Sequence, residues 1–113
     1  MSENKELKVV EKELVAEVVD GKEYELVKPI LIDGELVKVL KYDFEELTGD
    51  DVSTATKELG KRGIVVTMSE FDQNYHAMIF AISAGITFED VKRLKIKDFN
   101  KVCNLVRDFF LSE

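Results

Sequence analysis

The sequence predicts an α+β domain in which an N-terminal antiparallel β-hairpin or three-stranded meander is followed by about four α-helices. Three observations lead to this fold class. An Asp33-Gly34 pair lies between two apolar arms, hydroxyl residues precede acidic ones by three positions at several places in the second half, and apolar residues recur there at helical spacing. A chain of 113 residues buries enough surface for one core but not for two, so we expect a single domain over residues 1–113.

The hairpin is expected over residues 24–44, because Asp33-Gly34 supplies the positive φ angles of a type I′ turn. Pro29 lacks an N–H group, which predicts a missing ladder partner or a bulge at that position. The register set by the turn pairs Leu31 with Leu36 and Val27 with Leu40 on one face, and Ile30 with Val37 and Lys28 with Val39 on the other.

Apolar side chains therefore crowd both faces of this hairpin, whereas a half-exposed hairpin alternates apolar with polar residues. Either a helix and the N-terminal segment cover the two faces, or one face is a protein-binding surface. We expect the face that bears Lys28 and Lys41 to be the open one. The charged ends of these side chains resist burial, while their aliphatic stems can line an interface. The candidate partner-binding residues are Lys28, Ile30, Val37, Val39 and Lys41.

Residues 1–23 form a variable N-terminal segment with an ambiguous pattern. Leu7, Val10 and Leu14 fall at helical spacing, while the run from 15 to 19 also suits a strand. A second Asp-Gly pair at 20–21 favours the strand, which would cover about residues 14–19 and pair with the first arm of the hairpin.

The helical part is expected over residues 48–112, and its helix starts are marked by capping pairs. These pairs are Thr48 with Asp51, Ser69 with Asp72, and Thr87 with Asp90. The first helix should end near Gly60 or Gly63, a nearly all-apolar central helix should end at Gly85, and two more should cover about 87–94 and 98–111. Residues 63–68 are β-branched and are expected to form a loop or short strand. The expected core residues are Phe71, Tyr75, Met78, Ile79, Ile82, Phe99, Val102, Val106 and Phe109.

No pattern in the chain indicates catalysis, a cofactor or a metal. His76 and Cys103 stand on different expected helices. His76 is better explained as a partly buried or surface imidazole than as a catalytic base, and Cys103 as a small core side chain than as a nucleophile. The paired acids at 45–46 and 50–51 suit helix starts. We therefore expect a protein that is not an enzyme.

The net charge and the hydropathy of the chain argue against two classes of partner, nucleic acids and membranes. The net charge of −7 repels nucleic-acid backbones, and no apolar run approaches the length of a membrane span. A basic cluster late in the chain is expected to be solvated helix surface, balanced by nearby acids, rather than an RNA site. We expect no nucleic acid, no membrane and a cytosolic setting. The cluster consists of Lys92, Arg93, Lys95, Lys97 and Lys101.

The order of several short motifs carries a family resemblance. They are Lys28-Pro-Ile with the Asp-Gly turn, Thr48-Gly-x-Asp51, Asp72-x-x-Tyr75, Ala81-x-x-Ala-Gly-Ile86, Glu89-Asp90 and Asp98-Phe-x-x-Val-x-x-x-Val-Arg-Asp-Phe-Phe110. Over roughly residues 24–111 the chain resembles the tail assembly chaperones of tailed bacteriophages and prophages.

This resemblance implies a small protein without enzymatic activity that binds the tape measure protein, keeps that long apolar chain soluble and helps recruit tail tube subunits. It implies action in the host cytoplasm and absence from the finished particle, and some members are also made in a longer, frameshifted form. The family offers no catalytic residues to transfer. A structural subunit of the tail or baseplate, and an unrelated regulatory module, are the alternatives, and the apolar surface could instead close a homo-oligomer.

Overall fold

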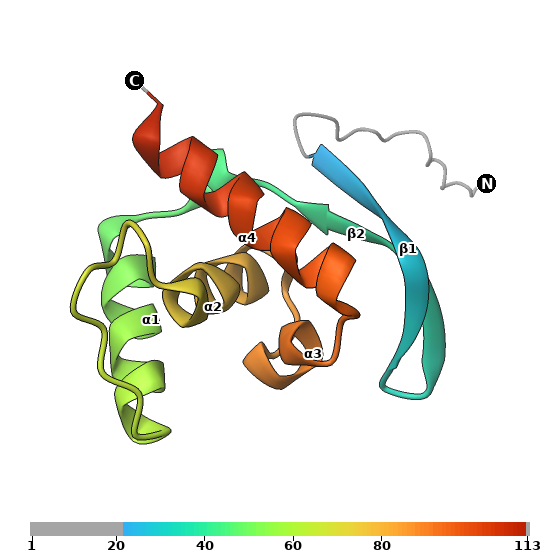
Figure 1. Ribbon diagram of the computed structural model, residues 1–113, viewed down its shortest axis with the longest axis horizontal. Helices are drawn as coiled ribbons and strands as arrows, with labels where there is room; N and C mark the ends of the chain where they lie inside the picture. Colours follow the sequence, from blue (N-terminus) through green and yellow to red (C-terminus); the bar gives the residue numbers. More distant parts are fainter. Residues whose placement is uncertain (1–21, 113) are drawn as a thin grey trace.

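The computed structural model describes residues 22–112 and confirms the α+β class, with a two-stranded antiparallel hairpin followed by helices (Figure 1). The expected third strand at 14–19 lies outside the described residues. The elements are β1 (Lys22–Ile32), β2 (Glu35–Tyr42), the 3-10 helix η1 (Phe44–Glu46), α1 (Gly49–Lys61), α2 (Gln73–Ala84), α3 (Phe88–Lys92) and α4 (Ile96–Leu111).

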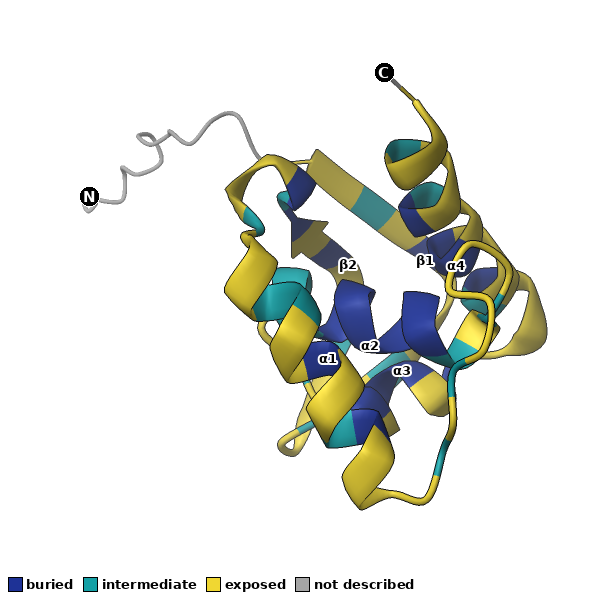
Figure 2. Cartoon of the chain, turned by 90° about the vertical axis from the view of Figure 1, so that its left-hand side faces the viewer, coloured by how far each residue is buried: buried dark blue, intermediate teal, exposed yellow. Residues whose placement is uncertain are grey.

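Helix α2 is the centre of the fold. It contacts α1, α3, α4 and β2, and its residues from Tyr75 to Ala81 are all buried, which confirms the nearly all-apolar helix expected from the sequence (Figure 2). The base of the hairpin is anchored to it by aromatic rings. The centroid of the Phe80 ring lies 5.4 Å from that of Tyr42 and 6.2 Å from that of Phe44.

Two of the three expected capping pairs form. Thr48 with Asp51 and Thr87 with Asp90 each make a complete capping box at the start of a helix. The prediction of a capping pair between Ser69 and Asp72 is wrong, because α2 begins four residues after Ser69. Asp72 itself is the N-cap, and its side chain accepts a hydrogen bond from the Tyr75 N–H at 2.9 Å. Gly85 ends α2 in the left-handed conformation, as expected.

The later start of α2 also corrects the expected core. Phe71 precedes the helix and is 61% exposed, whereas we expected it to be buried. The other expected core residues lie in or against the core: Tyr75, Met78, Ile79, Val102 and Val106 are buried, and Ile82, Phe99 and Phe109 are half-buried. Residues 63–68 form a loop, and α4 begins at Ile96, two residues earlier than expected.

The hairpin register is right near the turn and wrong beyond it. Asp33 and Gly34 have φ angles of 52° and 82°, as a type I′ turn requires. The pairs Leu31 with Leu36 and Ile30 with Val37 are confirmed. The expected pairs of Val27 with Leu40 and Lys28 with Val39 are replaced by Tyr24 with Leu40 and Glu25 with Val39, because β1 is irregular between Glu25 and Ile30.

Candidate functional site

The irregular part of β1 is held by one side chain of α4. Asp98 lies in the first turn of α4 and is fully buried. Its carboxylate accepts hydrogen bonds from the backbone N–H groups of Val27, at 2.9 Å, and Lys28, at 3.0 Å, and from the Tyr24 hydroxyl, at 2.7 Å. Pro29 follows without an N–H of its own, so Asp98 supplies acceptors where the ladder with β2 is interrupted.

The charge of Asp98 is maintained by these partners. Burial pushes the pKa of Asp98 upward, but the two N–H groups and the Tyr24 hydroxyl outweigh it and hold that pKa below its ordinary value. Burial, together with the hydrogen bond to Asp98 and its charge, raises the pKa of Tyr24 to about 12. At neutral pH the pair is therefore a carboxylate accepting from a neutral phenol.

Large apolar side chains are exposed on the hairpin. Val27, Leu31 and Leu36 are 62%, 60% and 61% exposed, respectively. Leu31 and Leu36 lie opposite each other beside the turn. Val27 lines a cleft of about 280 Å³ together with Ile96, which is 73% exposed at the start of α4. We call these four residues the hairpin patch.

Lysines surround part of this patch. Lys28, Lys95 and Lys97 line the same cleft as Val27 and Ile96, and all three are exposed. The chain as a whole carries a net charge of −7, so this cleft is a local basic region on an acidic protein. An apolar floor with basic edges is suited to an amphipathic segment with acidic residues beside its apolar stripe.

The structure exposes only some of the partner-binding residues expected from the sequence. Lys28, Val39 and Lys41 are exposed, with Val39 at 39%, whereas Ile30 and Val37 are half-buried and pack against the core.

Sequence reasoning did not select the residues of the hairpin patch. It placed Val27, Leu31 and Leu36 on the face that was expected to be covered, and Pro29 signals an irregularity without showing that Val27 meets Ile96 there. The tip of the hairpin also contacts the end of α3. The side chain of Arg93, the C-cap of α3, donates to the Leu31 carbonyl and pairs with Asp90 at 2.8 Å.

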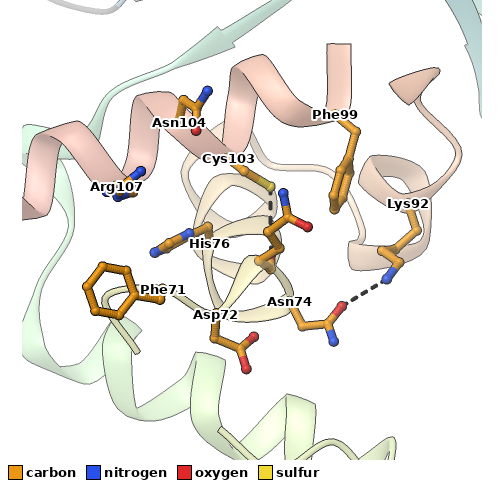
Figure 3. Close-up of a pocket in the computed structure, with 10 residues that line it drawn as sticks. Phe71, Asp72, Asn74, His76, Lys92, Phe99, Cys103, Asn104 and Arg107 are labelled. Carbon is orange, nitrogen blue, oxygen red and sulfur yellow. Dashed lines mark hydrogen bonds between the residues drawn. The ribbon is translucent and has the colours of Figure 1, made fainter. Parts of the chain in front are cut away.

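His76 and Cys103 come from different helices, as expected, but the structure brings them to one cleft of about 650 Å³ between the start of α2 and α4 (Figure 3). Burial lowers the pKa of His76 and raises the pKa of Cys103 to about 12, so both side chains are neutral at pH 7. Cys103 is 2% exposed, in agreement with its expected place in the core. Within residues 22–112, no group of three or more His, Cys, Asp or Glu side chains is placed to hold a metal ion.

Comparison with known families tests the resemblance found in the sequence. A sequence model described as phage tail assembly chaperone proteins, E, or 41 or 14, matches residues 23–111. The chain belongs to this family. The match covers the hairpin, all the helices described above and both clefts. No curated protein and no solved structure matches the chain.

Membership in the tail assembly chaperone family assigns the chain a role in assembling phage tails. Two of the motifs that carried the resemblance meet in space, since Asp98 binds the backbone of Lys28 directly before Pro29. The described part of the chain contains no helix that is long and apolar enough to cross a bilayer.

Proposed function

We propose that the chain is a chaperone without enzymatic activity that binds the tape measure protein in the host cytoplasm, helps recruit tail tube subunits and is left out of the finished particle. The observation that carries this proposal is the exposure of Val27, Leu31 and Leu36, each at 60% or more, on one hairpin. Exposed apolar side chains gathered on one element are typical of a protein-binding surface.

The chemistry of the hairpin patch suits a long apolar client. A tape measure chain that is still unassembled exposes apolar helix faces, and Leu31, Leu36 and Ile96 offer them a competing apolar contact. Lys28, which lines a cleft with Val27 and Ile96, adds an aliphatic stem with a charged end. The net charge of −7 opposes association of unloaded copies through these same apolar residues.

Coexpression with the tape measure protein tests this proposal. We expect the full chain to copurify with the tape measure protein and to increase its soluble amount. Replacing Leu31 and Leu36 together by Ser should reduce both effects severalfold. The unfolding midpoint should move by only a few degrees, because both side chains are already about 60% exposed.

Val65→Ser is the matched control. Val65 is 80% exposed and lies in the loop between α1 and α2, at the other end of the molecule from the hairpin (Figure 1). This variant removes a similar exposed apolar side chain and should leave copurification unchanged. Equal loss with Val65→Ser, or full binding by the Leu31 and Leu36 double variant, would show that the hairpin patch does not bind the client.

Two further measurements separate the remaining alternatives. Mass spectrometry of purified particles should find no copies of the chain, and copies at stoichiometric levels would identify a structural subunit of the tail. Sedimentation of the chain alone and of the double variant tests whether the hairpin patch joins copies of the chain. If only self-association is lost, the patch is a homo-oligomer interface.

A further inference from the structure

The cleft between α2 and α4 takes no part in the client binding proposed for the hairpin, yet it has features of a binding site. Its volume is about 650 Å³, and the close-up shows side chains from the start of α2, from α4 and from the end of α3 arranged around it (Figure 3). Phe71 stands at one end, exposed by 61% although the sequence pattern places it in the core. An exposed aromatic side chain beside a polar cleft is a common feature of binding sites.

Each end of this cleft carries a cation that rests against an aromatic ring. The guanidinium carbon of Arg107 lies 5.7 Å from the centroid of Phe71. The ammonium nitrogen of Lys92 lies 5.7 Å from the centroid of Phe99 and 2.8 Å from the Asn74 side-chain oxygen. These contacts position the two cations without neutralising them.

Within residues 22–112, no carboxylate forms an ion pair with Arg107 or Lys92, and both side chains are exposed. Asp72 is the one carboxylate lining the described cleft, and it points away from α4 and caps the N–H of Tyr75 (Figure 3). The amides of Gln73 and Asn104 line the space between the two ends.

The cleft runs along α4, and its length there guides the choice of probe. Phe99, whose ring lies against Lys92, and Arg107 are eight residues apart on α4, which corresponds to about 12 Å along the helix axis. Two carboxylates on a bound helix match this span when they are about eight residues apart. On an extended strand the separation is about four residues. An apolar side chain between them would contact Phe71 or Phe99.

We propose that the α2–α4 cleft binds an acidic peptide segment of a partner protein, with Arg107 and Lys92 each pairing with one of its carboxylates. A nucleic-acid backbone carries a negative charge at every phosphate, so the chain's net charge of −7 opposes it more strongly than a peptide with two carboxylates. The proposal depends on the residues of the cleft alone and does not require the hairpin to bind the tape measure protein.

Designed peptides test this inference on the full chain. The first probe is a fluorescein-labelled helical peptide rich in alanine, with two Glu eight residues apart and one Leu between them. The second is an extended peptide with two Glu four residues apart. Each has a counterpart in which Gln replaces both Glu. By fluorescence anisotropy, at least one Glu peptide should bind about tenfold more tightly than its Gln counterpart, with affinity falling as salt is raised.

Variants that each remove one positive charge show where the peptide binds. Arg107→Gln and Lys92→Gln should each weaken binding about three- to fivefold. Lys57→Gln is the control, because it removes the same charge from an exposed position on α1. All three side chains are exposed, so the unfolding midpoint should move by only a few degrees, and measuring it for each variant separates lost affinity from unfolding.

Several outcomes would overturn the inference. Equal affinity for Glu and Gln peptides, or equal loss with Lys57→Gln, would remove the role of the two cations. Tighter, Arg107-dependent binding of a single-stranded oligonucleotide would make this a nucleic-acid site. Absence of peptide binding, with self-association that depends on Arg107 and Lys92, would make the cleft an interface between copies.

Discussion

The carboxylate of Asp98 accepts the backbone N–H of Lys28 at 3.0 Å, although the two residues are 70 positions apart in the chain. Through this contact and the neighbouring one to Val27, the start of α4 replaces β2 as the partner of β1. The irregular part of β1 is therefore tied to a buried charge in the helical part of the domain.

Replacing Asp98 by Asn should destabilise the fold. The amide keeps the size of the side chain, but it turns an N–H₂ group toward donors that need acceptors and removes the charge. We expect the free energy of unfolding to fall by about 2 to 4 kcal/mol. Urea denaturation measures this loss.

Asp108→Asn is the control for this substitution, because Asp108 is an exposed residue of the same helix. Its effect should stay within about 0.5 kcal/mol. Similar small effects of both substitutions would mean that Asp98 does not hold the irregular part of β1.

The hydrogen bond from Tyr24 to Asp98 should make the stability of the fold depend on pH in the alkaline range. Its pKa is raised to about 12 in the folded chain, above the value of about 10 in an unfolded one. The contribution of the neutral hydroxyl is therefore fully present below pH 10 and is lost as the pH rises through 12. Urea midpoints between pH 9 and 12 should fall less steeply for Tyr24→Phe than for the unaltered chain.

Lysines and the remaining tyrosines titrate in both proteins, so the difference between the two slopes isolates Tyr24. Parallel slopes would show that the hydroxyl is not held by Asp98 in solution.

Features that depend on neighbouring residues could be predicted from the sequence. The turn at Asp33-Gly34, the capping box at Thr87 and the helix end at Gly85 each need a particular backbone angle or a hydrogen bond within a few residues. Their residue types are restricted by that local chemistry.

Features that depend on distant contacts could not be predicted in this way. The register of β1 beyond Pro29 is decided by Asp98, and no local pattern shows which acid supplies the acceptors. Phe71 fits the helical spacing of α2, but Asp72 competes as the cap and places Phe71 before the helix, beside Arg107. Both differences lie at the surfaces proposed to bind partners.

Substitutions of Ile79, in α2, and of Phe71, before α2, should differ in their effect on stability because only the first side chain is buried. Ile79→Ala removes a fully buried side chain from the core and should cost about 2 to 5 kcal/mol of stability. Phe71→Ala should cost less than about 1 kcal/mol, because the ring is 61% exposed. Comparable losses in urea denaturation would place Phe71 in the core after all.

The thiol of Cys103 should be unreactive while the chain is folded. It is 2% exposed, and burial raises its pKa to about 12, compared with about 8.5 for a free thiol. The thiolate is the reactive form, and the raised pKa leaves very little thiolate in the folded chain at pH 8. Labelling with an aromatic disulfide reagent at pH 8 should therefore be at least about a hundredfold slower in buffer than in urea. A folded chain that labels as fast as the unfolded one would show that the floor of the α2–α4 cleft is open to solvent at Cys103.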